Sequence, residues 1–254
     1  MPWNPEVYNQ FKSIRFQPFF DLMDLIEHKP GMQAVDLGCG TGEQTAILAA
    51  HFKAAHFLGI DSSASMLAER PETTERLAFR QSTTEAWLQE AQTWDLVFSN
   101  AALQWSEDHK NLFPQMISKI RPGGQLAVQM PYQPGNSLNQ LLAALAGEVP
   151  YKTQLKNWNR PSPVLTLDEY ARILFENGME QIQLVQKVYP IIAEDSDTLF
   201  RFISGSALIP YLERLDEGQS ELFQAAFKAR IALAFPKFPA IYAFKRLLIY
   251  GKRA

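Results

Sequence analysis

The sequence has a single cysteine and lacks any long run of uncharged apolar residues. With Cys39 as its only thiol, the 254-residue chain has no internal disulfide and no second thiol for a zinc site. No segment is apolar enough for long enough to span a membrane, and the first thirty residues mix charged side chains with aromatic ones, unlike a signal peptide. We therefore expect a cytoplasmic globular protein without a membrane partner.

The chain also lacks an excess of either charge and has few histidines. Its 24 basic and 27 acidic side chains leave a formal net charge of -3, which argues against the basic surface of a nucleic-acid-binding domain. The four histidines, His28, His51, His56 and His109, lie apart without the spacing of metal ligands. We expect the first three at the surface or at helix ends, His109 on a helix surface, and no metal site.

Short apolar runs alternate with helix-length segments through the first half of the chain. Five runs have the length of buried strands: 33–39, 55–61, 76–82, 94–100 and 123–130. Helix-length segments follow the first, second and fourth runs, the last with Ser106 as its expected N-cap and Pro122 and Gly123 at its end. With further strands at 181–191 and 243–253, the pattern predicts an α/β fold with a doubly wound, mostly parallel seven-stranded sheet.

The stretch "AVDLGCGTGEQT", residues 34–45, gives up its large side chains directly after the first strand. A strand followed by glycines lets the backbone approach a ligand closely at the carboxyl end of the sheet. A dinucleotide loop reads G-x-G-x-x-G and binds a pyrophosphate, whereas this loop reads D-x-G-x-G-x-G. Because Asp36 and Glu43 stand at its two ends, it suits a cation better than a diphosphate.

"VDLGCGTG" resembles the first motif of the S-adenosylmethionine-dependent class I methyltransferases, which have a Rossmann-like fold. The resemblance implies that this loop packs against the amino-acid end of the cofactor, that Asp61 accepts both ribose hydroxyls, and that Met66 lies against the adenine. Where many relatives have an acidic residue for the adenine amino group, this chain offers Thr83, Thr84 and Glu85. The candidate residues for binding S-adenosyl-L-methionine are Asp36, Gly38, Gly40, Gly42, Asp61, Ser62, Met66, Thr83, Thr84, Glu85 and Asn100.

The fourth strand ends in "NAALQW" rather than the N-P-P-Y type motif of nucleic-acid amino-methyltransferases. "NAALQW", "LFPQMI", "LAVQMP", "ALIPYLERL" and "YAFKRLLIYG" instead resemble, in order, the trans-aconitate 2-methyltransferase family along nearly the whole chain. That resemblance implies a small-molecule acceptor, most specifically trans-aconitate, one of whose carboxylates is esterified. A carboxylate has a pKa of about 4 and is already an ionised nucleophile at neutral pH, so we expect no catalytic side chain and no general base.

Cations are needed to hold such an acceptor, and arginine binds carboxylates with two hydrogen bonds. The acceptor-binding candidates are Arg15, Trp105, Arg160, Tyr211 and Arg246. Two positions depart from the family pattern: Ile209 and Gln17 stand where relatives often have basic residues. These departures leave open an acceptor with fewer carboxylates or a longer apolar body, such as a fatty-acid-like acid. The "LQW" element also occurs in related enzymes that esterify a malonyl group on a carrier protein, so that acceptor stays open as well. A nicotinamide oxidoreductase and a non-catalytic S-adenosylmethionine-binding protein are the alternatives from other classes.

We expect one structural domain built from four stretches of chain. Cap helices occupy 1–30 and the cofactor-binding core occupies 31–130. A lid of loop and helices spans 131–180, and its polar stretch 150–165 shows no strand or helix pattern. The last two strands lie in 181–254 with a helical insertion at about 195–236. Oligomeric state leaves no signal in the sequence.

Overall fold

The computed structural model describes the backbone from Lys12 to Ala254 and the side chains from Phe16 onward. The chain forms two compact units. Of the described residues, the sheet unit consists of 17–131, 163–187 and 246–254, and the helical unit consists of 12–16, 132–162 and 188–245. The single-domain organisation expected from the sequence stays a prediction.

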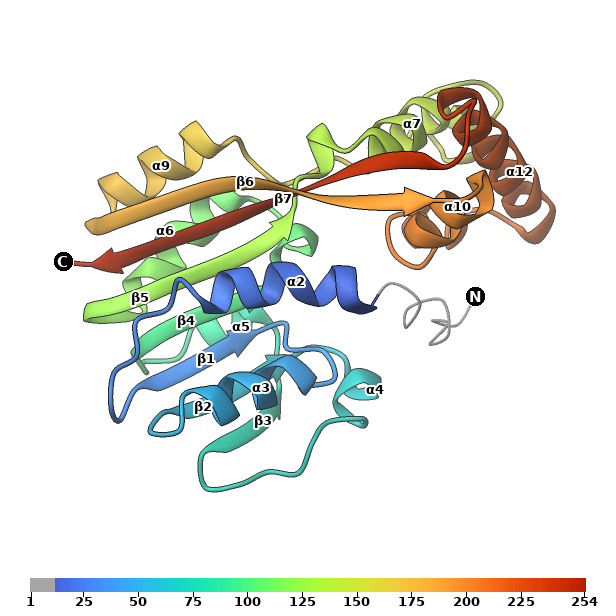
Figure 1. Ribbon diagram of the computed structural model, residues 1–254. Helices are drawn as coiled ribbons and strands as arrows, with labels where there is room; N and C mark the ends of the chain where they lie inside the picture. Colours follow the sequence, from blue (N-terminus) through green and yellow to red (C-terminus); the bar gives the residue numbers. More distant parts are fainter. Residues whose placement is uncertain (1–11) are drawn as a thin grey trace. The chain divides into compact units, whose positions relative to one another are not determined.

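Seven strands form one sheet in the order β3-β2-β1-β4-β5-β7-β6 (Figure 1). β1 pairs in parallel with β2 and β4, β2 with β3, and β4 with β5, whereas β7 runs antiparallel to β5. The doubly wound, mostly parallel sheet predicted from the sequence is thereby confirmed. The strands are β1 (Gln33–Leu37), β2 (His56–Asp61), β3 (Leu77–Gln81), β4 (Trp94–Asn100), β5 (Ile120–Pro131), β6 (Met179–Ala193) and β7 (Ala240–Arg253).

Helices of the sheet unit cover both faces of the sheet (Figure 1). One face carries α3 (Glu43–His51) and the part of α2 (Lys12–Met23) from Gln17 onward, and the other carries α5 (Thr84–Leu88) and α6 (His109–Ser118). α4 (Ala64–Leu67) follows β2, and α9 (Leu167–Glu176) precedes β6. The Phe19 ring of α2 packs edge to face against the Phe98 ring of β4, with the ring centroids 6.0 Å apart, and both side chains are fully buried. This apolar contact holds α2 against the strand that leads to the candidate site.

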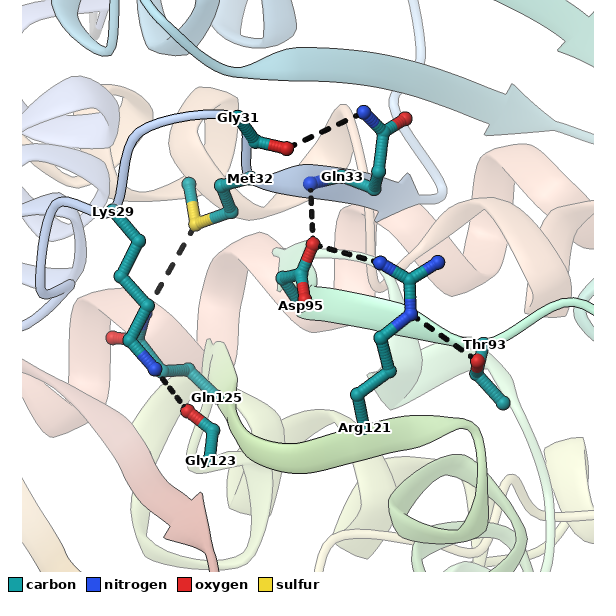
Figure 2. A network of polar contacts seen from close by, with 9 residues as sticks. All are labelled: Lys29, Gly31, Met32, Gln33, Thr93, Asp95, Arg121, Gly123 and Gln125. Atoms are coloured by element: carbon teal, nitrogen blue, oxygen red, sulfur yellow. Dashed lines mark hydrogen bonds and ion pairs between the residues drawn. The ribbon is translucent and has the colours of Figure 1, made fainter.

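Polar contacts join three central strands of the sheet at their amino ends (Figure 2). Asp95 Oδ2, on β4, accepts the backbone N–H of Gln33 at 2.8 Å and the Arg121 Nη1–H at 3.0 Å. The Lys29 ammonium donates to the Gly123 carbonyl. These contacts fix the amino ends of β1, β4 and β5 relative to one another.

Gln125 makes a second tie, in the buried interior of the sheet unit. Its Oε1 accepts the backbone N–H of Glu27 at 2.7 Å and the Tyr250 hydroxyl at 2.9 Å, and its Nε2 donates to the Glu27 carbonyl at 2.9 Å. A buried amide with its polar atoms paired stabilises a single arrangement of the segments it joins. Gln125 therefore fixes the segment before β1 to β5 and β7.

The helical unit has an apolar core of its own, drawn from its helices and from the residues of β6 and β7 that belong to it. Leu199, Phe223 and Phe227 are fully buried in it. The Asn136 side chain binds the backbone of Lys245 with two hydrogen bonds, as a neighbouring strand would. Its Nδ2 donates to the Lys245 carbonyl at 3.1 Å, and its Oδ1 accepts the Lys245 N–H at 2.8 Å. Its helices are α7 (Ser137–Ala146), α8 (Tyr151–Gln154), α10 (Ser196–Ser204), α11 (Ile209–Leu212) and α12 (Glu217–Ala234).

Three local expectations were wrong. Asp108, in a left-handed conformation, precedes α6 in place of the expected Ser106 cap. β5 begins at Ile120 because Ile120 pairs with Trp94, and a register shift absorbs the residues that were expected to end a helix. The polar stretch 150–165 contains the short helix α8. Within the described residues, no helix combines the length and apolar composition that crossing a membrane requires.

Candidate functional site

The glycine loop joins β1 to α3 at the carboxyl end of the sheet, and its three alternate glycines have positive φ. The φ angles are 73° at Gly38, 58° at Gly40 and 73° at Gly42, a region that side chains other than glycine rarely adopt. A Cβ at Gly38 would lie 2.2 Å from the Ala102 Cβ, and one at Gly42 would lie 2.4 Å from the Phe79 ring. The glycines of the D-x-G-x-G-x-G motif are therefore required for two reasons. The backbone has positive φ at all three, and at Gly38 and Gly42 a neighbouring element leaves no room for a Cβ.

Asp61 ends β2 and holds the middle of this loop. Its Oδ2 accepts the backbone N–H of Gly40 and its Oδ1 accepts the backbone N–H of Ser63, each at 2.8 Å. An ionised carboxylate has about four acceptor positions, so both oxygens keep a lone pair for a further donor. The Ile60 carbonyl accepts the Gly38 N–H at 2.7 Å and draws the loop onto the same strand end.

The other cofactor-binding candidates lie in the two segments that directly follow β2 and β3. A Cβ at Gly40 would lie 3.3 Å from Met66 Cε, so the Met66 side chain of α4 lies beside the loop. Ser62 accepts a hydrogen bond from the Gln81 amide through its carbonyl at 3.1 Å. The Thr83 hydroxyl caps α5 by accepting the Ala86 N–H at 3.1 Å. Thr84 and Glu85 form the first turn of that helix, where Glu85 is exposed.

Asp36 lies at the end of β1 and is almost completely buried. The Thr45 hydroxyl of α3 donates to its Oδ2 at 2.6 Å. Burial raises the pKa of Asp36 to about 7 and the nearby Asp61 charge adds to the rise, while the Thr45 hydrogen bond opposes it. A positive charge beside this carboxyl would favour its ionised form.

Asn100, the last residue of β4, completes the cofactor candidates. Its Nδ2 donates to Gln44 Oε1 of α3 at 2.9 Å. Its Oδ1 is buried and accepts no hydrogen bond within the described part of the chain. Buried acceptors are rarely left unpaired, because the lost hydration is not replaced. The oxygen is therefore suited to a donor that comes from a ligand.

The segment after β4 is strained and is held by a residue whose position was wrongly predicted. Ala101 and Asp108 both have left-handed backbones, with φ of 55° and 50°. His109 is 1% exposed rather than on the helix surface, because its ring turns inward. Its Nε2–H donates to the Leu103 carbonyl at 2.9 Å, and the Tyr170 hydroxyl lies 2.5 Å from its Nδ1. These two contacts of His109 hold the short helix η1 (Leu103–Trp105) in place.

The tautomer of His109 follows from these partners. A carbonyl oxygen only accepts, so the proton lies on Nε2, and in the neutral ring Nδ1 accepts from the Tyr170 hydroxyl. Burial lowers the pKa of His109, which favours this neutral form. The expectation for the other histidines is confirmed, since His28, His51 and His56 are exposed.

Two acceptor candidates, Arg160 and Tyr211, line one pocket of about 330 Å³ in the helical unit. The Tyr211 hydroxyl accepts the Arg160 backbone N–H at 3.3 Å and donates to Asn159 Oδ1 at 2.8 Å. Burial lowers the pKa of Arg160, as expected for a guanidinium partly removed from water. Ile209 begins α11 in the same unit and is half-buried.

The other acceptor candidates belong to different parts of the chain. Trp105 is 48% exposed in the sheet unit. Arg246 is buried there, and its Nη1 donates to Gln129 Oε1 at 3.3 Å. Arg15 lies in α2, but its side chain is outside the described residues; Gln17 of the same helix is exposed. No cluster of His, Cys, Asp and Glu side chains among the described residues could hold a metal ion.

Comparisons with known proteins agree with this geometry. A family described as "Methyltransferase domain" matches residues 28–195. A trans-aconitate 2-methyltransferase of Deinococcus radiodurans is 41% identical over 260 aligned positions, which cover 100% of this chain and 99% of the relative.

Solved structures show the same fold at lower identity. The YcgJ protein of Bacillus subtilis has a TM-score of 0.60 and 16% identity, over 93% of this chain and 98% of that one. Phosphoethanolamine N-methyltransferase 2 of Haemonchus contortus, solved with S-adenosylhomocysteine, has a TM-score of 0.56 and 17% identity, over 93% of this chain and 52% of that one. The chain thus belongs to the methyltransferase domain family and is an S-adenosylmethionine-dependent class I methyltransferase.

Proposed function

We propose that this enzyme transfers the methyl group of S-adenosylmethionine to a carboxylate of trans-aconitate. The observation that carries the proposal is the full-length, 41% identical relative named trans-aconitate 2-methyltransferase. Likeness over the whole chain includes the helical unit, where acceptor candidates lie, and is more specific than the glycine loop alone. An arginine on a pocket wall supports an anionic acceptor.

The loop residues fit the cofactor by charge. S-adenosylmethionine has a sulfonium and an ammonium group, both positive, and when bound it supplies an electrophilic methyl group. Asp36 and Asp61 offer carboxylates, and Asn100 offers a buried oxygen without a protein partner. We propose that Asp61 accepts the ribose hydroxyls with its remaining lone pairs, while Asp36 and Asn100 face the positive end.

The adenine end is assigned to the candidates after β2 and β3. In the proposal, Met66 and Ser62 lie along the adenine, and Thr83, Thr84 and Glu85 lie near its amino group. Because the Thr83 hydroxyl already caps α5, only its further lone pair or proton is available to the base. Gly38, Gly40 and Gly42 contribute space and backbone rather than side-chain contacts.

The acceptor needs orientation more than activation. Its carboxylate is ionised at neutral pH, so the protein has to align oxygen, methyl carbon and sulfur and to exclude water; positioning of this kind can supply about 7–11 kcal/mol. We propose Arg15, Arg160 and Arg246 as the cations that hold the carboxylates, and Trp105 and Tyr211 as apolar walls. Tyr211 also positions the Arg160 backbone.

The test is transfer of labelled methyl from S-adenosylmethionine to trans-aconitate, with cis-aconitate, citrate, isocitrate and a free fatty acid assayed in parallel. We expect base-labile label in trans-aconitate, because a methyl ester hydrolyses in alkali. Cofactor binding without label in trans-aconitate would overturn the proposal. Label in the fatty acid instead would favour a less charged acceptor and agree with the loss of cations at Ile209 and Gln17.

A further inference from the structure

Three polar side chains share one face of the sheet where β4 and β5 approach their carboxyl ends. Asn100 of β4 lies directly opposite Gln129 of β5, so their side chains leave the same face. Gln129 in turn lies opposite Leu248 of β7, and Arg246 is two residues along that strand. Because alternate residues of a strand share a face, Asn100, Gln129 and Arg246 form a row across three strands.

Gln129 is completely buried, and one end of its amide has no partner. The Arg246 Nη1–H donates to Gln129 Oε1 at 3.3 Å, whereas Gln129 Nε2 makes no hydrogen bond with any described residue. The orientation of the amide follows from this contact, because exchanging oxygen and nitrogen would set two donors against each other. An unpaired buried donor destabilises a fold, and few are present in native proteins.

We propose that Gln129 is an acceptor-binding residue whose Nε2–H donates to a carboxylate oxygen of the methyl acceptor. The inference rests on the proposed carboxyl methyl transfer. Because the Arg246 guanidinium lies beside the Gln129 amide, a carboxylate that accepts from Nε2–H would also lie near a positive charge, which strengthens the interaction. Arg246 polarises the Gln129 amide by donating to its oxygen, so the two residues act as one binding pair.

The pair also has a specificity consequence. Asn100 presents an unpaired acceptor on the same face of the sheet, whereas Gln129 presents an unpaired donor. A cationic group suits the former and a carboxylate suits the latter. The row therefore changes from acceptor to donor character between neighbouring strands, as a site for a positive methyl donor and a negative methyl acceptor requires.

The decisive variant is Gln129→Glu. It keeps the oxygen that accepts from Arg246 and the size of the side chain, but it replaces the unpaired donor with an anionic oxygen. We expect the KM for trans-aconitate to rise at least tenfold, while the S-adenosylmethionine Kd stays within twofold and the melting temperature does not fall. A purely structural role predicts the reverse: an unchanged KM with an altered melting temperature.

Two further variants separate the alternatives. Gln129→Met removes the donor without adding charge, and we expect a smaller rise in KM than in Gln129→Glu. Gln125→Glu changes a buried glutamine of the same strand whose amide is fully paired; we expect a lower melting temperature with KM within twofold. Equal loss of cofactor affinity and acceptor affinity in Gln129→Glu would assign Gln129 to the cofactor and overturn the inference.

The wild-type enzyme distinguishes failure of the inference from failure of the proposed function. Turnover of trans-aconitate with an unchanged KM in Gln129→Glu overturns only the inference. No turnover of trans-aconitate overturns the proposed function, and the Gln129 comparison is then made with whichever carboxylic acid the wild type esterifies. Esterification of no carboxylic acid overturns both.

Discussion

The Asp61 carboxylate accepts the Gly40 backbone N–H at 2.8 Å, so a side chain at the end of β2 holds the centre of the glycine loop. The same carboxylate binds the Ser63 N–H that precedes α4. One residue thus fixes both segments between which the cofactor is proposed to lie. Its effects on stability and on cofactor binding have to be measured separately.

We expect Asp61→Ala to raise the S-adenosylmethionine Kd tenfold or more, which is about 1.4 kcal/mol, because the ribose loses its acceptor. Isothermal titration calorimetry gives the Kd, and thermal unfolding gives the stability loss. Asp95→Ala is the matched control, since Asp95 also accepts two hydrogen bonds but lies at the amino end of β4, away from the carboxyl ends of the strands. Equal Kd values for Asp61→Ala and wild type would contradict the ribose assignment.

Gly38→Ala should abolish cofactor binding and lower stability by more than the strain of positive φ alone. Left-handed backbone costs a residue other than glycine about 1–2 kcal/mol, and the new Cβ would also overlap Ala102. Gly31→Ala isolates the first effect, because Gly31 has a φ of 75° with open space around it. We expect Gly38→Ala/Ala102→Gly to recover part of the stability, as measured by urea unfolding. Failure to recover would place the damage in φ rather than in the overlap.

Asp36 should give the stability a pH dependence of defined sign. Its pKa is about 7 in the folded protein against an ordinary value of 3.8. The folded state therefore holds a proton that the unfolded state has lost, so the contribution is fully present below about pH 4 and disappears as pH rises through 7. The free energy of unfolding of wild type minus that of Asp36→Asn should fall between pH 5 and pH 8. Parallel curves would contradict a raised pKa.

Tyr170→Phe should lower both stability and kcat while leaving cofactor affinity unchanged. It leaves His109 Nδ1 buried without its donor, at a cost of about 1–3 kcal/mol, and loosens the turn that presents Trp105. Tyr250→Phe loses a comparable buried hydroxyl contact, to Gln125, and should lower stability alone. Equal kcat values for Tyr170→Phe and Tyr250→Phe would show that the turn is irrelevant to catalysis.

His109 also gives the stability a pH dependence. Because the pKa of His109 is lowered, its neutral form stabilises the fold above about pH 6.5, and that stability is lost as pH falls.

Arg160→Lys should raise the KM for the acceptor more than it changes the cofactor Kd, because the planar fork is lost while the charge remains. Tyr211→Phe should act in the same direction through the loss of the Arg160 backbone contact. Arg230→Lys is the matched control: it makes the same substitution in the helical unit, at an arginine that pairs with Glu148, and should leave the acceptor KM unchanged. Steady-state kinetics at saturating cofactor measure these values, and an unchanged KM in Arg160→Lys would remove it from the acceptor site.

The sheet was predictable because each buried strand is a short local apolar run. β4 was predicted at its observed bounds of 94–100. The start of β5 could not be predicted, because Pro122 and Gly123 are typical of the end of a helix. They belong to the strand only because Ile120 pairs with Trp94. α8 escaped because its four residues, "YKTQ", carry no apolar period.

The site shows the same division between local and distant information. The glycine loop and Asp61 lie within a short stretch whose spacing is visible in the sequence. The burial of His109 depends on Tyr170, 61 residues away, and the role proposed for Gln129 depends on Arg246, 117 residues away. No periodicity connects residues so far apart, so their partnership appears only in the fold.

The tie between Gln125 and Tyr250 spans 125 residues of chain. Joining β5 to β7 closes a loop that contains most of the helical unit, and the entropy of that closure has to be overcome before the pair gains stability. The parallel strands β1 to β5 need no such closure with the last strand. We therefore expect β7 to join the sheet late in folding, with the helices inside the loop shortening the distance that its ends must search.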